Sequence, residues 1–236
     1  MKIEYLFYLL VFPGLLFTST LGLVVGWVDR KVSARFQFRV GPPFFQNFND
    51  FFKLLGKETM ITKETVASLF ISAPFIAFAM IVLVSTMIGA ALFFNVSYGG
   101  DLLVVMYLLM LYSVMVILGG SSTGNVFSSI GASREIKLLL ADELAFIFVL
   151  LVPIVKAGYS VNLEGIIAAQ TEGAFIGSAS GIIAFIIGIL CIQAKMTLPP
   201  FHIPEAETEI IEGPFMEYSG PPLAFWKLGH LMMWVT

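Results

Sequence analysis

The sequence predicts an all-α fold, a polytopic bundle of membrane helices with five complete spans and the start of a sixth. Of the 236 residues, 58% are apolar and only 12% are charged, whereas soluble domains carry roughly a quarter charged residues. Several apolar runs also reach the length of about 20 residues that crosses the hydrocarbon core of a bilayer. Since no low-complexity linker divides the chain, residues 1–236 are expected to form a single transmembrane domain in the lipid bilayer.

The predicted spans follow the apolar runs in order along the chain. The five complete spans are residues 5–27, 66–94, 102–120, 138–158 and 174–194. The first run is too long for the core of a signal peptide and lacks a basic leader, so we expect it to be retained. Pro74 is expected to kink the second span or mark its beginning. The sixth run begins near residue 222 with LAFWKLGHLMMWVT, which is shorter than a span requires, so this span is expected to be incomplete here.

Lysine and arginine are distributed unequally between the loops on the two sides of the predicted bundle. The loop at 28–65 carries Arg30, Lys31, Arg35, Arg39, Lys53, Lys57 and Lys63, the next loop on that side carries Arg134 and Lys137, and the third begins at Lys195. Loops 95–101 and 159–173 have neither residue, which leaves only Lys2 and Lys156 near the other side. The positive-inside rule therefore predicts a multi-pass protein of the cytoplasmic membrane, with its N-terminus outside and its main loops in the cytoplasm.

Several function classes lack support in the sequence. No basic stripe suited to nucleic acid is visible, so no nucleic-acid partner is expected. The single cysteine, Cys191, is expected to be a buried core residue. His202 and His230 are isolated in the sequence, and no phosphate-binding glycine loop or nucleophile constellation appears. We therefore expect no catalytic residue, no metal and no cofactor in this chain.

An amphipathic helix is predicted in the first cytoplasmic loop, beginning near Gly41-Pro42-Pro43. Its apolar face would carry Phe44, Phe48, Phe51, Phe52 and Leu55, and its polar face Gln46, Asn49, Asp50, Lys53 and Lys57. Such a helix lies along the membrane surface or forms one wall of an internal cavity, and both interpretations stay open. The candidate cavity-lining residues are Phe44, Phe48, Phe51, Asp50 and Lys53.

Two adjacent carboxylates, Asp142 and Glu143, lie near the start of the fourth span. If the helix begins near Ser133, after a loop at 121–137, they lie about 13 Å along it. Acids inside a membrane are costly and usually mark an ion or proton route. The alternative is a structural ion pair with Arg134 or Lys137.

The stretch from 199 to 222, PPFHIPEAETEIIEGPFMEYSGPP, concentrates five glutamates among six prolines. A helix over 205–212 would place Glu205, Glu209 and Glu212 on one face, with Glu207 opposite. Like charges at that spacing destabilise one another and raise at least one pKa. The prolines and aromatic residues favour a rigid, packed loop over a solvated acidic face. The candidate proton path comprises Asp142, Glu143, Glu205, Glu207, Glu209, Glu212 and Glu217.

Motifs from three loops together resemble a known family. RVGPP, DFFKLLGKE, GASRE and PFHIPEAETEIIEGPFMEYSG are similar to the membrane heel subunit of respiratory complex I, called subunit 1 or the H subunit. They also resemble its counterpart in archaeal group 4 membrane-bound NiFe hydrogenases and related sulfur-reducing complexes. Gly41-Pro42-Pro43 and the GASRE motif favour this hydrogenase-like branch.

The resemblance implies an anchor and coupling subunit with no redox centre of its own. Its partners would be an iron–sulfur small subunit and a hydrogenase-like large subunit, which hold iron–sulfur clusters and a NiFe centre, together with antiporter-like and small membrane subunits. Arginines in the loops would dock this peripheral arm, namely Arg30, Arg35, Arg39 and Arg134. The buried acids would link redox chemistry to H⁺ or Na⁺ translocation. The family typically has eight spans, so its last spans are expected to be missing from this sequence.

Two other functions remain open. In the first, the chain is the quinone-binding subunit of an NADH:quinone-type complex I, and the Phe-rich helix and acidic stretch line a quinone chamber. In the second, it is a stand-alone ion transporter that needs no redox partner.

Overall fold

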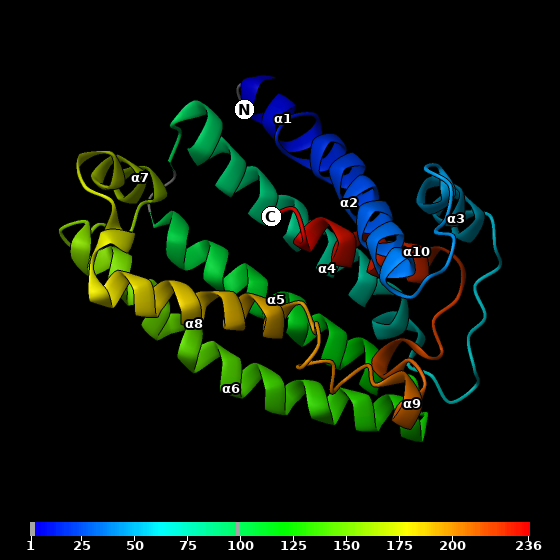
Figure 1. Ribbon diagram of the computed structural model, residues 1–236. Coiled ribbons are helices and arrows are strands. Elements are labelled where there is room, and N and C mark those ends of the chain that lie inside the picture. Colours follow the sequence, from blue (N-terminus) through cyan, green and yellow to red (C-terminus); the bar gives the residue numbers. More distant parts are fainter. Residues whose placement is uncertain (1–2, 98–99) are drawn as a thin grey trace.

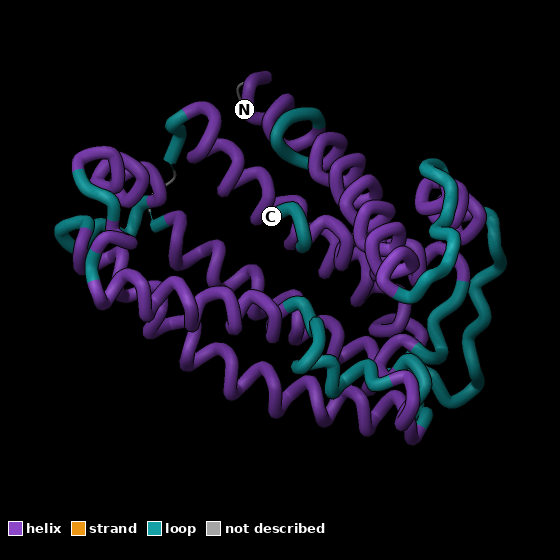
Figure 2. Tube along the Cα trace, in the orientation of Figure 1, coloured by secondary structure: helices purple, strands orange, loops and turns teal. Residues whose placement is uncertain are grey.

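The computed structural model describes residues 3–97 and 100–236, and in this part of the chain all regular secondary structure is helical (Figures 1 and 2). Lys2 lies outside the described residues. The α-helices are α1 (Ile3–Leu10), α2 (Leu15–Phe36), α3 (Gln46–Leu55), α4 (Ala67–Phe94), α5 (Asp101–Ser121), α6 (Val126–Lys156), α7 (Leu163–Glu172), α8 (Ala179–Lys195), α9 (Glu207–Ile210) and α10 (Gly220–Met233). Two 3₁₀ turns accompany them, η1 (Phe175–Gly177) and η2 (Gly213–Phe215). The predicted all-α class is confirmed.

Four helical segments are long and apolar enough to cross a membrane. They are Tyr5–Phe36, Ala67–Phe94, Asp101–Ser121 and Val126–Lys156, and each overlaps one of the first four predicted spans. The predicted fifth span corresponds to α8, which has 17 residues, fewer than the usual length of about 20. The sixth corresponds to α10, which begins at Gly220. The total number of complete spans remains a prediction.

The first span is interrupted between α1 and α2, where Phe12, Pro13 and Gly14 form a tight turn. A Cβ atom at Gly14 would lie 2.1 Å from the Leu9 carbonyl oxygen, so only glycine fits there. After this turn α2 continues to Phe36, well beyond the predicted end of the span at residue 27. Pro74 does not mark the start of the second span, because α4 begins at Ala67 and Pro74 lies inside the helix.

The helices pack in the order α2, α10, α4, α5, α6 and α8, each beside the next. Their shared core lies where α4, α5 and α10 meet, and its side chains include Phe70, Ala77, Ile81, Tyr112, Val116, Trp226 and Met232. Phe70 stacks on Tyr218, with ring centroids 4.1 Å apart and planes inclined by 4°. This stacking holds the segment at 196–219, hereafter the acidic loop, against the bundle core. Along the outer side, α6 and α8 leave most of their apolar side chains exposed.

The two ends of the bundle differ. α3 and α9 lie at one end, and α7 lies at the opposite end (Figure 1). The acidic loop joins α8 to α10 at the end that carries α3 and α9. We refer to this as the loop end, and it is where the candidate functional residues gather.

Two helix predictions at the loop end are wrong. α6 begins at Val126, where the Asn125 side chain accepts a hydrogen bond from the Phe127 amide at 2.9 Å, so the predicted loop at 121–137 is mostly helical. Asp142 therefore lies about 24 Å along the helix. The predicted helix at 205–212 shrinks to α9, because Ile211 adopts a positive φ of 66° that ends it. Glu205 and Glu212 consequently lie outside any helix and do not share a helical face with Glu209.

The amphipathic helix is present as α3, although it begins at Gln46 and not at the prolines. Its orientation differs from the prediction, because Asn47 is buried and Asp50 is half-buried, whereas the Phe52 side chain is 66% exposed. The reason is that α3 packs on α2 and α10 and is joined to α2 by a polar network described below. Its position relative to a membrane surface remains a prediction.

Candidate functional site

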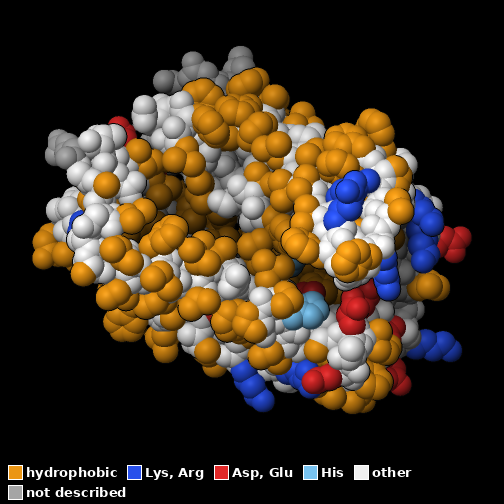
Figure 3. All heavy atoms as spheres, viewed as in Figure 1, with side chains coloured by type: hydrophobic (Ala, Val, Ile, Leu, Met, Phe, Trp, Pro, Cys, Tyr) orange, Lys and Arg blue, Asp and Glu red, His pale blue; other side chains and the backbone are white. Residues whose placement is uncertain are grey.

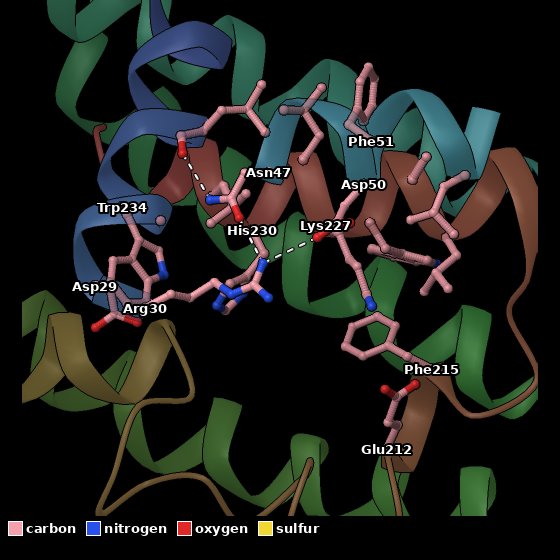
Figure 4. A pocket seen from close by; sticks show the side chains of 18 of the residues that line it. Asp29, Arg30, Asn47, Asp50, Phe51, Glu212, Phe215, Lys227, His230 and Trp234 are labelled. Atoms are coloured by element: carbon pink, nitrogen blue, oxygen red, sulfur yellow. Dashed lines mark hydrogen bonds and ion pairs between the residues drawn. The ribbon is translucent and has the colours of Figure 1, made fainter. Parts of the chain in front are cut away.

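A cavity of about 640 Å³ lies at the loop end, between α2, α3, α10 and the acidic loop (Figure 4). Its apolar wall consists of Leu23, Phe51, Leu54, Phe215, Leu223, Trp226, Leu228, Leu231 and Trp234. Its charged lining consists of Asp29, Asp50, Glu205, Glu207, Glu212, Arg30, Lys53, Lys57 and Lys227. His202 and His230 also line it, so the two histidines that are isolated in the sequence share one site. In the space-filling view, acidic and histidine side chains gather beside α3 within a mainly apolar surface (Figure 3).

A polar network fixes α3 against α2 and forms one wall of the cavity (Figure 4). Arg30 Nη1 donates to Asn47 Oδ1 at 2.8 Å and to Asp50 Oδ2 at 3.2 Å. Asn47 Nδ2 donates to the Leu23 carbonyl oxygen at 2.9 Å. Sequence reasoning missed Asn47. The available signal was an amide side chain in the first turn of a phenylalanine-rich helix, where a buried polar group needs a partner.

The predicted cavity-lining residues separate into two groups. Phe51, Asp50 and Lys53 line the cavity. Phe44 instead packs edge-to-face against Trp27, with ring centroids 5.0 Å apart. Phe48 is partly buried against the core cluster.

Glu205 is a partly buried carboxylate of the acidic loop that lines the cavity. The Thr197 hydroxyl donates to Glu205 Oε1 at 3.3 Å, and His202 Nδ1 donates to the Thr197 carbonyl oxygen at 2.9 Å. Burial raises the pKa of Glu205, and the nearby charges of Glu212 and Glu207 raise it further. The charge of His202 and the hydrogen bond from Thr197 lower it, but by less. Glu205 therefore holds a proton more readily than an ordinary glutamate.

Glu209 and Glu217 lie outside the cavity and connect the acidic loop to residues in and next to α6. Glu209 Oε2 lies 2.6 Å from Arg134 Nη1, which also donates to the Ile203 carbonyl oxygen at 3.2 Å. Glu217 Oε1 accepts a hydrogen bond from Asn125 Nδ2 at 2.5 Å. One contact is to the N-cap residue of α6 and the other is to the N-terminal third of that helix.

Asp142 and Glu143 share a buried cation that sequence reasoning did not assign to them. Lys195 Nζ lies 3.1 Å from Asp142 Oδ2 and 2.8 Å from Glu143 Oε2, and the three side chains are 9%, 5% and 12% exposed respectively. The predicted alternative, a pair with Arg134 or Lys137, is wrong because α8 packs beside α6 and brings its last residue to this level. Cys191, one turn earlier on α8, is buried as predicted.

Glu135 is a further acid that sequence reasoning missed. It is buried, and it lies on the same face of α6 as Asp142, two turns or about 10.5 Å earlier. Ser113 of α5 is a hydrogen-bonding neighbour of its carboxyl, and Glu205, Lys195 and Asp142 lie within electrostatic range. The two-turn spacing was readable in the sequence. Glu205, Glu135, Asp142 and Glu143 together form the acidic series, which leads from the cavity into the bundle.

The four arginines predicted to dock a partner occupy different places. Arg30 lines the cavity, and Arg134 binds the acidic loop. Arg35 and Arg39 are exposed. Between and beside them, Phe36, Phe38 and Val40 are 82%, 100% and 98% exposed. Residues 35–40 thus form an exposed segment that combines two cations with three apolar side chains.

The chain matches a described protein family over almost its whole length. The family model described as NADH dehydrogenase matches residues 8–236. The H subunit of NADH-quinone oxidoreductase from Thermomicrobium roseum is 34% identical, over 86% of this chain and 67% of that protein. Hydrogenase-4 component C of Escherichia coli (strain K12) is also 34% identical, over 86% of this chain and 64% of that protein.

A solved structure shares the fold. In the structure of the membrane-bound sulfane sulfur reductase, an archaeal respiratory membrane complex, one chain superposes with a TM-score of 0.82 and 22% identity, over 98% of this chain and 75% of that chain. The matches in sequence and fold cover the cavity, the acidic loop and α6. The chain therefore belongs to the NADH dehydrogenase family and is a homologue of the H subunit of NADH-quinone oxidoreductase and of hydrogenase-4 component C.

Proposed function

We propose that the chain is the membrane-anchor and coupling subunit of a complex-I-like respiratory oxidoreductase of the membrane-bound hydrogenase or sulfur reductase type. The acidic series carries this proposal, because it joins a cavity at the loop end to carboxylates within the helices. Acids placed inside a membrane bundle are costly and are typical of ion or proton routes. The hydrogenase-4 and sulfane sulfur reductase relatives support the hydrogenase or sulfur reductase type.

In this function, the chain's own residues hold and pass protons while electrons move in a partner. Glu205 is the first of these groups, since burial favours its protonated form. A change of charge above the cavity would alter that preference through space, because a nearby charge shifts a carboxyl pKa. Glu135 lies between the cavity and the pair formed by Asp142 and Glu143, so a proton or an accompanying charge shift can pass stepwise along α6. The coupling ion is H⁺ or Na⁺.

The exposed segment at 35–40 is the proposed docking surface for the peripheral arm. Arg35 and Arg39 suit acidic groups on the iron–sulfur small subunit and the hydrogenase-like large subunit, and Phe36, Phe38 and Val40 suit apolar pockets. Those partners would hold the iron–sulfur clusters and any NiFe centre, which supply the electron transfer. Antiporter-like and small membrane subunits would adjoin the exposed apolar sides of the bundle, with the loop end facing the cytoplasm.

The proposal is tested by neutralising members of the acidic series in the intact complex. Glu143→Gln and Glu135→Gln should abolish ion uptake by membrane vesicles, while the soluble module still reduces artificial acceptors. Glu164→Gln is the matched control, because Glu164 is an exposed residue of α7 at the opposite end. Wild-type ion uptake in both series variants would contradict the coupling role. Flux through the purified chain alone would instead indicate a stand-alone transporter.

A quinone-binding role in an NADH:quinone-type complex is the second candidate. One observation favours it: the buried Trp234 indole N–H lines the cavity without a hydrogen-bond partner among the described residues, and could donate to a quinone carbonyl. The NADH-quinone oxidoreductase relatives add support. Quinone that co-purifies with the complex, and is displaced by Trp234→Phe, would favour this candidate, whereas a quinone-free active complex would contradict it.

A further inference from the structure

Lys195 ends α8 but its ammonium lies between two carboxylates of α6, inside the bundle. Nζ is 2.8 Å from Glu143 Oε2 and 3.1 Å from Asp142 Oδ2. We propose that Lys195 is a tethered cation that makes the Asp142–Glu143 pair selective for protons over sodium ions. The inference rests on the proposed coupling function and specifies its ion.

The ammonium is enclosed by its contacts. Besides the two carboxylates, it lies 4.7 Å from the centroid of the Phe146 ring, in a cation–π arrangement. The Lys195 side chain is 9% exposed. The position next to both carboxylates is therefore already filled by a cation that is covalently attached to the chain.

The charges of this cluster leave room for one further positive charge. With all three groups ionised, the two carboxylates and the ammonium carry a net charge of about −1. Glu143 Oε1 is buried and makes no hydrogen bond within the described part of the chain. The titratable groups that face the cluster are Glu135 on α6 and Cys191 on α8, and neither supplies a cation. One proton on this carboxylate oxygen would bring the net charge of the cluster to zero.

Binding of a sodium ion at the same position would require a different set of ligands. A proton needs one oxygen lone pair, whereas hard metal cations need a shell of several oxygen ligands in exchange for their water. Lysine is a compact point charge, and here it occupies the space between the carboxylates from which such a shell would be built. It also repels a second cation at close range. Hence Lys195 permits protonation and opposes sodium binding.

Removing the ammonium should reverse this preference. Lys195→Met keeps an unbranched side chain, one atom shorter, but leaves two buried carboxylates with no cation, a site that attracts sodium. Lys195→Arg keeps a cation in place and should behave as the wild type does. Lys137→Met is the control, because Lys137 is an exposed lysine of α6.

The experiment measures thermal unfolding of the purified intact complex in NaCl and in choline chloride at equal ionic strength. The melting temperature of Lys195→Met should rise saturably with sodium, whereas wild type, Lys195→Arg and Lys137→Met should show no such rise. No turnover is required, so this readout is independent of the vesicle uptake test of the coupling function. A saturable sodium effect on the wild type would overturn the proposal, and so would its absence from Lys195→Met.

A second variant covers the case in which Lys195→Met does not assemble. Lys195→Met/Glu143→Gln returns the cluster to a net charge of about −1 with Asp142 alone. It should assemble and should still melt at a higher temperature with sodium than with choline. A double variant that fails to assemble, or that assembles and ignores sodium, contradicts the assignment.

Discussion

Arg134 on α6 and Glu209 on α9 are 75 residues apart in the sequence, yet Nη1 and Oε2 lie 2.6 Å apart. Arg134 also donates to the Ile203 carbonyl oxygen, so one guanidinium holds two points of the acidic loop. Their side chains are 27% and 60% exposed. The pair therefore positions the loop from its outer side and does not face the cavity.

The first prediction concerns this pair. A double-mutant cycle of Arg134→Ala and Glu209→Gln should give a coupling energy of only about 0.2–1 kcal/mol, because exposed ion pairs are screened by solvent. Denaturant unfolding of the purified complex would measure it. Glu209→Gln should also retain more ion uptake than Glu205→Gln, since Glu209 lies outside the cavity. Equal losses in the two variants would argue that Glu209 belongs to the proton route itself.

The second prediction concerns Glu205 and pH. Burial raises the pKa of Glu205 in the folded state, so its protonation contributes to the free energy of unfolding. This contribution is fully present below the ordinary glutamate pKa of about 4.3 and is lost as the pH rises through the raised folded-state pKa. Glu205→Gln cannot ionise and so does not lose this contribution. The melting temperature of the variant minus that of the wild type should therefore increase between these two pKa values and stay constant at higher pH. Melting temperatures of the complex at stepped pH would show this. Glu209→Gln serves as the exposed control, and a constant offset between Glu205→Gln and wild type would contradict the shift.

The third prediction concerns the contact between α6 and η2. A Cβ atom at Gly131 would lie 2.8 Å from the Pro214 backbone nitrogen and 2.6 Å from its Cδ. Gly131→Ala should therefore cost about 1–3 kcal/mol through overpacking and should displace the acidic loop. Gly56→Ala is the control, since its nearest atoms would be at an ordinary 3.8 Å. Equal melting temperatures for the two variants would show that the loop yields without cost.

The fourth prediction concerns Asn47, which links α3 to Arg30 and to the Leu23 carbonyl. Asn47→Ala should cost about 1–3 kcal/mol, because it leaves buried partners without their hydrogen bonds. Asn49→Ala, on the exposed side of the same helix, should be near neutral. Unfolding of the complex in denaturant would compare them. A cost confined to Asn49→Ala would mean that α3 is held by other contacts.

Local patterns were sufficient to predict most of the helices. Apolar runs predicted the long spans within a few residues of α4 and α5, and the period of the phenylalanines predicted α3. The extent of α9 could not be predicted in this way. It depends on close tertiary contact at Gly213, whose Cβ would lie 2.1 Å from the Pro204 carbonyl oxygen, and on the positive φ of Ile211.

The candidate site was predictable in its residue types but not in its pairings. Asp142 and Glu143 were recognisable as unusual acids, but their cation is 52 residues away from Glu143 on another helix. Lys195 has the position of an ordinary basic residue at the end of a span, which the positive-inside rule explains without a partner. Only the packing of α8 beside α6 distinguishes its role. Long-range ion pairs of this kind leave no local signal in a single sequence.

The last prediction concerns the exposed segment at 35–40. Reversing the charge of both Arg35 and Arg39 to glutamate should lower retention of the soluble module on membranes about tenfold, equivalent to about 1.4 kcal/mol, through lost attraction and new repulsion. Added salt should release the wild-type module progressively, and should affect the variant less. Sedimentation of membranes followed by quantification of the bound module would measure both effects. Glu164→Lys on α7, at the opposite end of the bundle, should leave retention unchanged. Retention that is unaffected by the reversal, or lowered equally by Glu164→Lys, would mean that the peripheral arm docks elsewhere.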